Sequence, residues 1–105
     1  MPQPPPLTAE QRKAALEKAA AVRRARAELK ERLKLGSLTL ADLLEQAEDD
    51  DVIGKMKVSA VLESLPGVGK VKARRTMEEI GIAPTRRVRG LGDQQRAALL
   101  RSFPG

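Results

Sequence analysis

The sequence contains no cysteine and no histidine, and Phe103 is its only aromatic residue. Without thiols and imidazoles, the chain lacks the usual ligands of a structural zinc site, a cysteine nucleophile, and a histidine to act as general acid or base. Single-strand binders of the RNA-recognition and oligonucleotide-binding types stack bases on several aromatic side chains. These absences argue against most enzymes and against a protein that binds nucleic acid by base stacking.

Long apolar runs are also missing. The longest have four or five residues, far below the ~20 that a membrane-spanning helix requires. The amino-terminal sequence MPQPPPLTAEQ has no charged start followed by an apolar stretch, so nothing in it resembles a secretory signal. We therefore expect a cytoplasmic protein with no membrane partner.

Positive charge is what the chain has in excess, with 20 Lys and Arg against 14 Asp and Glu and a net charge of +6. Residues 1–35 carry +5, residues 36–54 carry −6 and residues 55–105 carry +7. Two basic blocks around an acidic spacer favour an anionic partner and a face turned away from it, although a solvated acidic helix explains the spacer equally well. Because Lys, Arg and backbone amides must supply the affinity, double-stranded DNA held by its phosphates is the expected partner.

The chain is long enough for one domain with appendages. Residues 1–7 are proline-rich and have almost nothing to bury, so they are expected to form a disordered tail. Thr8 and Gln11 make a capping box, and no Gly or Pro interrupts the segment that follows. Residues 8–35 should therefore form one long helix with solvent-exposed first turns, and residues 36–105 the DNA-binding core.

Several shorter helices are expected in the core, because apolar residues recur there at helical spacing and no stretch alternates like a strand. Pro66 should end one helix, and Gly81 another, with Ile82 placed for a hydrophobic capping contact. Gly92 or Asp93 should begin the last. The marking positions are Leu40, Leu43, Leu44 and Ala47; Val58, Val61, Leu62 and Leu65; Val71, Ala73, Met77 and Ile80; and Leu99, Leu100 and Phe103.

Asp49, Asp50 and Asp51 are three consecutive carboxylates between two expected helices. Any of them can cap a helical turn that begins near Val52. A metal site is the alternative, but consecutive residues do not converge on one cation without a shaped loop such as the calcium-binding one. We therefore interpret the three residues as a turn and expect no metal and no other cofactor.

The string LESLPGVGKVKARRTMEEIGI, residues 62–82, places apolar residues, two glycines and a small Ala73 where the helix-hairpin-helix nucleic-acid module has them. Gly67 and Gly69 let the backbone turn sharply and approach a phosphate, while amides at the start of the next helix point outward as donors. Such a hairpin reads no base sequence. Its expected DNA contacts are Pro66, Gly67, Val68, Gly69, Lys70 and Lys72.

Two other interpretations of this glycine hairpin (residues 66–70) deserve comparison. The Gly-x-Gly could be a plain turn between helices, but the surrounding apolar pattern favours the module. GVGK is also similar to part of a nucleotide-binding P-loop. That motif needs Gly where Ser64 stands and Ser or Thr where Val71 stands, and it should follow a strand, so we reject it.

Two further basic groups are candidate DNA contacts. The arginine loop (residues 86–90) lies in RRVRGLG, and its candidate residues are Arg86, Arg87, Arg89 and Gly90. Arginine enters narrow minor grooves and holds phosphates bidentately, although an ordinary solvated loop is the alternative. The basic stripe of the first helix has spacings of three, four and four, and could equally serve solubility. It consists of Arg23, Arg26, Lys30 and Lys34.

Taken together, these segments resemble the actinobacterial-type integration host factor family, which is mycobacterial and Streptomyces-like and unrelated in fold to the HU-like factor of the same name. VIGKMKVSA and RRVRGLG are the most specific stretches, whereas residues 35–48 are less diagnostic. The resemblance implies an all-α fold: a helix-two-turns-helix core that contains the helix-hairpin-helix and is similar to a ribosomal small-subunit protein, with a long N-terminal helix.

The same resemblance implies a nucleoid-associated architectural protein that is not an enzyme. Such a protein binds duplex DNA with little sequence preference, bends and compacts the chromosome, and supports phage integrase in site-specific recombination at attachment sites. For this chain, the resemblance gives the hairpin Pro66 to Lys70 and the arginines Arg86, Arg87 and Arg89 as the contacts. We expect it to act as a monomer.

An RNA-binding or ribosomal protein is the main alternative, because the same core serves in the ribosome. Ribosomal proteins of this kind usually add a long basic carboxyl-terminal tail, whereas this sequence stops at Gly105. A base-excision glycosylase with an amino-terminal proline nucleophile is the enzymatic alternative, and Pro2 invites it. Gln3 replaces the acid expected beside that proline, and a base-flipping pocket does not fit in so small a domain.

Overall fold

The computed structural model describes residues 8–103, and the expected proline-rich tail, residues 1–7, lies outside the described residues. In the described part, α-helices and one short 3-10 helix are joined by turns, and the only extended pairing is an isolated antiparallel bridge between Lys57 and Arg87. The predicted all-α class is therefore confirmed. No helix in this part of the chain is both long and apolar enough to span a membrane.

Helix α1, Ala9–Leu35, begins and ends where local signals place its caps. The Thr8 hydroxyl accepts a hydrogen bond from the Gln11 amide at 3.0 Å, and the Gln11 side chain accepts one from the Thr8 amide at 3.0 Å. Gly36 stops the helix with a left-handed φ of 78°, which glycine adopts at little cost. The capping box and the helix length are thus confirmed.

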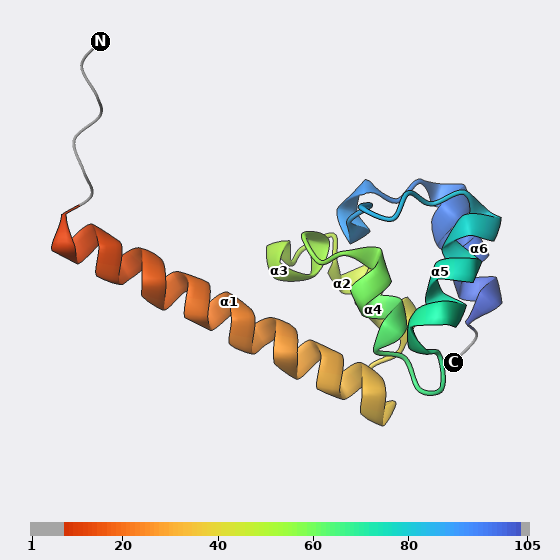
Figure 1. Cartoon of the computed structure of the whole chain (residues 1–105), viewed down its shortest axis with the longest axis horizontal. Coiled ribbons are helices and arrows are strands. Elements are labelled where there is room, and N and C mark those ends of the chain that lie inside the picture. Colours follow the sequence, from red (N-terminus) through yellow and green to blue (C-terminus); the bar gives the residue numbers. More distant parts are fainter. Residues whose placement is uncertain (1–7, 104–105) are drawn as a thin grey trace, which may run out of the picture.

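Only the last turns of α1 are packed into the domain. Residues 9–19 are exposed on every side, and the buried residues of the helix are Leu29 and Leu33. Figure 1 shows the amino-terminal half extending away from the remaining helices. The expected exposure of the first turns is confirmed, and their helicity must come from Ala, Glu, Lys and Arg propensity and from the cap.

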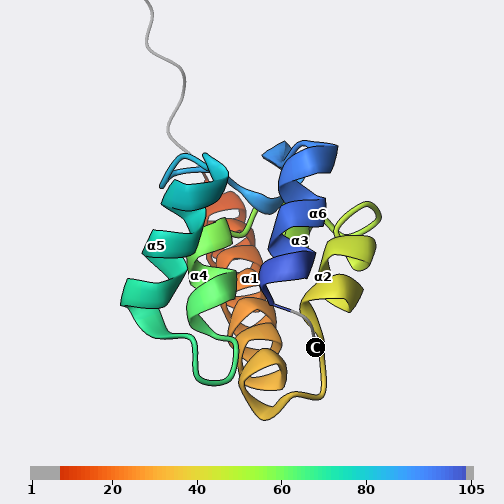
Figure 2. The same cartoon turned by 90° about the vertical axis from the view of Figure 1, so that its right-hand side faces the viewer.

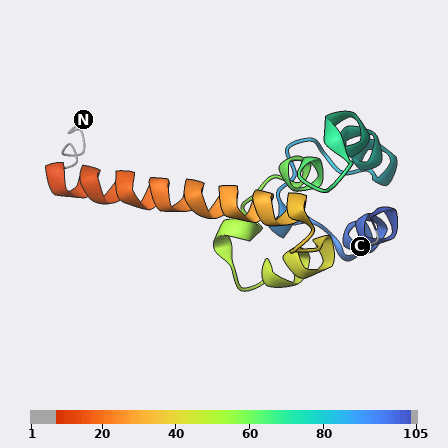
Figure 3. The ribbon, with the colours of Figure 1, turned by 90° about the horizontal axis from the view of Figure 1, so that it is seen from below.

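The remaining elements pack around the carboxyl-terminal half of α1. Figures 2 and 3 show α4 and α5 on one side of it, with α2 and α6 on the other. The elements are α2 (Leu40–Gln46), α3 (Asp51–Gly54), α4 (Val58–Glu63), α5 (Gly69–Ile80), the 3-10 helix η1 (Val88–Gly90) and α6 (Asp93–Ser102).

Every α-helix of the described part contributes at least one fully buried side chain to the hydrophobic core, which in α5 is Ala73. Burying an aliphatic side chain of this size stabilises the fold by roughly 1.5–3 kcal/mol before entropy is counted. The largest fully buried side chains are Leu33, Leu43, Ile53, Val58, Val61, Leu62 and Leu99. One small core thus joins many short helices, with Val88 of the arginine loop inside it and Val68 of the glycine hairpin packed against it.

Two details differ from the sequence prediction. Val71 is 72% exposed instead of marking the core face of α5, because it precedes the buried Ala73 by two residues, or about 200° around a helix. Helix α4 ends at Glu63, so Leu65 and Pro66 lie in the following turn. The other predicted caps are confirmed: the Ile82 amide donates to the Met77 carbonyl at 2.8 Å after Gly81.

Of the three consecutive aspartates, only Asp49 lies in a turn; Asp50 caps the next helix, as predicted, and Asp51 is already the first residue of α3. One Asp50 carboxylate oxygen accepts hydrogen bonds from the amides of Val52 at 2.9 Å and Ile53 at 3.4 Å, and so caps α3. Within residues 8–103, no three or more acidic side chains are grouped in a way that could hold a metal ion. Asp50 is a cap, which leaves Asp49 and Asp51 exposed beside it.

Candidate nucleic-acid interface

The glycine hairpin joins α4 to α5 through two left-handed residues. Gly67 has φ 72° and Gly69 has φ 68°, values that cost an L-residue about 1–2 kcal/mol. A Cβ atom on either glycine would meet no heavy atom within 4 Å. The glycines are therefore required by the backbone conformation, and their outer side is open to an approaching ligand.

Helix α5 begins in this hairpin without a side-chain cap. Its N-cap residue is Val68, no side chain accepts from the first amides, and the first turn contains no acidic residue. The first amides of a helix have no partner within the helix, and the helix dipole makes that end positive. Lys70 lies in the same turn and is exposed. These features together make an anion-binding end.

The structure separates the two hairpin lysines. Lys72 places its ammonium 5.9 Å from the centre of the Phe103 ring, a cation-π distance. It lines a groove of about 360 Å³ together with Val68 and Ser102, toward the end of α6. Lys70 instead lines the groove of about 840 Å³ between α4 and α5, with Glu63 and Arg74 among its neighbours.

Part of the basic stripe of α1 reaches the hairpin. Lys30 and Lys34 line one groove of about 680 Å³ together with Pro66, Gly67 and Gly69. Glu31 and Glu63 also line this groove, so its charge is mixed. The carboxyl-terminal half of the stripe and the hairpin thus share one surface, which sequence spacing alone did not establish.

The amino-terminal half of the stripe divides further. Arg23 is exposed, whereas Arg26 is half-buried and its Nε is buried without a hydrogen-bond partner among the described residues. Arg26 therefore lies partly against the protein, and Arg23 is the freer of the two.

The arginine loop is attached to the connection between α3 and α4. The Val58 amide donates to the Arg86 carbonyl at 3.0 Å, and the Val88 amide donates to the Met56 carbonyl at 2.9 Å. Val88 is buried and fixes the loop to the core. This pairing sets Arg87 opposite Lys57.

Lys55 and Lys57 are therefore basic neighbours of the arginine loop that the sequence analysis did not select. Both are exposed. They lie in VIGKMKVSA, a stretch identified as specific, but their partner segment is about thirty residues away in the chain. The only available signal was their charge beside an otherwise apolar segment.

Each loop arginine already has an acceptor in the protein. Arg86 donates from Nη1 to the Gly90 carbonyl at 3.1 Å, and Arg87 donates from Nη1 to the Lys55 carbonyl. Arg89 donates from Nη2 to Asp51 Oδ1 at 2.6 Å. A guanidinium has five N–H donors, so all three arginines keep donors for another anion.

Arg89 and Asp51 form an ion pair, and this pair changes the pKa of Asp51. The hydrogen bond from Arg89, and then its charge, lower the pKa of the Asp51 carboxyl below its ordinary value. Both side chains remain substantially exposed, at 50% for Arg89 and 76% for Asp51.

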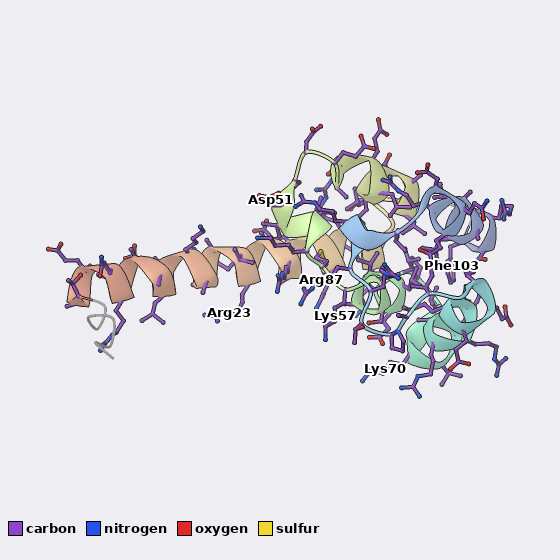
Figure 4. All side chains as sticks on the ribbon, turned by 90° about the horizontal axis from the view of Figure 1, so that it is seen from above. Arg23, Asp51, Lys57, Lys70, Arg87 and Phe103 are labelled. Atoms are coloured by element: carbon purple, nitrogen blue, oxygen red, sulfur yellow. The ribbon has the colours of Figure 1, made fainter. Side chains whose placement is uncertain are left out.

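Basic side chains from different elements face the same side of the molecule. In Figure 4 the labelled Arg23, Arg87, Lys57 and Lys70 follow one another along the side on which α4 and α5 lie. The acidic helix α2 lies on the opposite side of α1, as Figures 2 and 3 show. These four basic side chains and the acidic helix α2 thus lie on different sides of α1, whereas Asp51 of the acidic spacer meets Arg89.

Comparison with known proteins gives similarity over nearly the whole chain. The family described as S13-like H2TH domain matches residues 33–103. An integration host factor of Mycobacterium tuberculosis is 69% identical over 99 residues, covering 94% of each chain. An integration host factor of Streptomyces coelicolor is 64% identical over 99 residues, covering 94% of this chain and 92% of the relative.

A solved structure is also similar to this chain, in both fold and sequence. The structure of sIHF bound to an 8-base-pair palindromic DNA matches this fold with a TM-score of 0.81 and 61% sequence identity. The match covers 83% of this chain and 98% of that chain.

Proposed function

This chain belongs to the integration host factor family and carries its S13-like H2TH domain, and from that premise we propose that it is an architectural protein of duplex DNA. The role is binding and shaping, without a catalytic step. It is supported by the names of the relatives and by the DNA present in the sIHF structure. The alternative of an RNA-binding or ribosomal protein is not favoured by these relatives.

One observation carries the proposal at the level of atoms. In Figure 4, Lys70 near the uncapped start of α5 and Arg87 of the arginine loop lie on the side of the molecule where Arg23 and Lys57 are also labelled. The hairpin offers backbone donors to one phosphate, and the loop offers guanidinium groups to others. Neither recognises a base edge, so binding is expected to be largely independent of sequence.

The proposed contacts fall into a first and a second group. The hairpin and the arginine loop form the first group, with Lys55 and Lys57 added beside the loop. Lys30, Lys34 and Arg23 form the second, because they extend the same surface along α1. Arg26 and Lys72 are weaker candidates, since each is partly engaged within the protein.

The division of the chain follows from this arrangement as a proposal. We treat residues 8–35 as a helix that carries the second group of contacts and residues 36–105 as the helix-two-turns-helix core. Leu29 and Leu33 of the helix are buried in the hydrophobic core, so we expect residues 36–105 to need the end of this helix in order to fold.

Several finer roles belong to the same proposal. We infer that the protein bends and compacts chromosomal DNA in the nucleoid, acts as a monomer, and supports phage integrase at attachment sites. Contacts spread from the core along α1 support bending, because a rigid body that holds phosphates along one side fixes the path of the duplex.

A competition experiment tests the proposal. A labelled 30-base-pair duplex is displaced by equal masses of unlabelled duplex, single-stranded DNA or structured RNA, and the affinity is measured from 50 to 200 mM salt. We expect duplex to compete best, and contact with ~6 phosphates to cost ~10³ in affinity over that salt range. Stronger competition by structured RNA, or a flat salt response, would contradict the proposal.

A further inference from the structure

Arg89 is docked against α3 in a position that only glycine leaves open. A Cβ atom built on Gly54 would lie 2.9 Å from Arg89 Nε, 2.9 Å from Nη2 and 3.0 Å from Cζ. These three nearly equal distances mean that the guanidinium lies flat against the Gly54 backbone. Gly54 has no left-handed φ, so its backbone conformation does not require glycine, and an added Cβ would push the Arg89 guanidinium away.

Asp51 holds the same guanidinium from its edge. Its Oδ1 lies 2.6 Å from Arg89 Nη2, and Asp50 fixes the start of α3 beneath it. Among the described residues, Arg89 is the loop arginine that is paired with a carboxylate, because Arg86 and Arg87 donate to neutral backbone carbonyls. The lowered pKa of Asp51 agrees with a direct charge contact.

A carboxylate and a phosphate use the same donors of an arginine. An ion pair this exposed to solvent contributes little to stability, so an arriving phosphate can displace Asp51 at small cost. The side chains of Asp51 and Arg89 are both open to solvent, which leaves room for that exchange.

We propose that Asp51 is an internal competitor of DNA phosphate for Arg89, and that Gly54 and Asp51 together set the affinity of the arginine loop for DNA. In the free protein, Arg89 is docked on α3; on DNA, it leaves Asp51 for a phosphate oxygen. The inference rests on the proposed function and assigns Asp51 and Gly54 a part in it, acting through Arg89.

Two variants undock Arg89 by different means, which makes the inference testable. Asp51→Asn removes the competing charge and keeps the shape of the side chain. Gly54→Ala removes the room for the guanidinium without changing any charge. Asp49→Asn is the matched control, because Asp49 is an exposed acid two residues from Asp51 with no ion pair among the described residues.

Duplex affinity is measured for the full-length wild type and these three variants at low salt, each also combined with Arg89→Ala. We expect Asp51→Asn and Gly54→Ala each to tighten binding by about two- to fivefold, the range that a surface ion pair allows. Asp49→Asn should change the affinity less than either. Both gains in affinity should disappear in the Arg89→Ala background, because the guanidinium for which Asp51 and phosphate compete is absent.

Each of the following results would overturn the inference. Weaker binding by both Asp51→Asn and Gly54→Ala would mean that the contact with α3 holds Arg89 in the position that binds DNA. Equal gains from Asp51→Asn and Asp49→Asn with none from Gly54→Ala would mean that only net charge matters. Gains that persist without Arg89 would place the effect elsewhere.

The wild-type titration separates this inference from the proposed function. If the wild type binds duplex and Arg89→Ala weakens it while the undocking variants leave it unchanged, only the inference fails. If the wild type does not bind duplex, the proposed function fails and the inference fails with it. Circular dichroism melting of each variant shows whether a loss comes from unfolding.

Discussion

The glycine hairpin and the arginine loop offer DNA two different kinds of donor. The hairpin presents backbone amides at a helix start that is fixed by the fold and that no side chain among the described residues caps. The arginine loop presents long side chains that are already bonded to Gly90, Lys55 and Asp51. The hairpin is therefore ready before DNA arrives, whereas Arg89 of the loop, by our inference, leaves Asp51 for a phosphate. Binding at the hairpin loses less conformational entropy, because its amides are already in place. Each contact from the arginine loop is stronger, because a guanidinium is charged.

Of the changes that distinguish the glycine hairpin from the arginine loop, removal of the loop's charge should reduce duplex affinity the most. We expect the combined Arg86→Ala, Arg87→Ala and Arg89→Ala variant to weaken duplex binding by about 100-fold or more, since three charge-assisted contacts are lost. The slope of log affinity against log salt should fall by about two to three.

Two unrelated duplexes should be weakened alike by that triple change, and the far-ultraviolet circular dichroism should stay helical because the three side chains are exposed. A loss confined to one duplex sequence would contradict backbone recognition and indicate base readout.

Disturbing the hairpin backbone should come second. Gly69→Ala forces an L-residue into φ 68°, at about 1–2 kcal/mol, and should displace the first amides of α5, with roughly tenfold weaker binding. Gly36→Ala is the matched control, because Gly36 also has a left-handed φ, 78°, with open space around its Cβ.

Both glycine variants should lose similar thermal stability, but only Gly69→Ala should lose affinity. Fluorescence anisotropy with a labelled duplex, below the melting temperature of both variants, distinguishes them. Equal affinities would show that the hairpin is only a turn.

Replacing either hairpin lysine by alanine should change the duplex affinity less. Lys70→Ala should weaken duplex binding about threefold and reduce the salt slope by about 0.9, as expected for one phosphate contact. Lys72→Ala should leave most of the affinity and instead lose the contact with Phe103, worth about 0.5–1 kcal/mol at an exposed site. Comparison of salt titrations with thermal melts gives the answer, and a larger binding loss for Lys72→Ala would reverse the assignment.

The smallest effect is the titration of Asp51. Because Arg89 lowers its pKa in the folded protein, the ion pair stabilises the fold above the unfolded-state pKa, and the contribution is lost as pH falls through the folded-state pKa. In Arg89→Ala the Asp51 pKa should rise toward its ordinary value. Carboxyl carbon NMR measures both, and an unchanged pKa would show that the ion pair is not formed in solution.

Features encoded by neighbouring residues were predictable from the sequence. Thr8 with Gln11, and Gly36 or Gly81 after a helical run, act within one turn of the chain, so the helix boundaries followed. The hairpin was predictable for the same reason, because two left-handed glycines and the following helix start are contiguous. Val71 was misplaced because an apolar residue next to a hairpin was counted as core, although its angle around α5 differs from that of Ala73.

Features made by distant segments were not predictable in the same way. Lys57 pairs with Arg87 across about thirty residues through a single bridge, with no strand pattern to announce it. Asp51 and Arg89 are 38 residues apart, and their contact depends on the space left by Gly54. Packing decides such pairs, and a sequence shows only that opposite charges exist.

The unequal packing along α1 has a consequence for its motions. Its exposed amino-terminal turns are held by capping and propensity alone, and an isolated helical segment of this length is only marginally stable in water. Their amides should therefore exchange with solvent deuterium by local fraying, while those around Leu29 and Leu33 should exchange only when the whole domain opens. One continuous helix would thus show a gradient of protection, from fast at Glu10 to slow at Leu33.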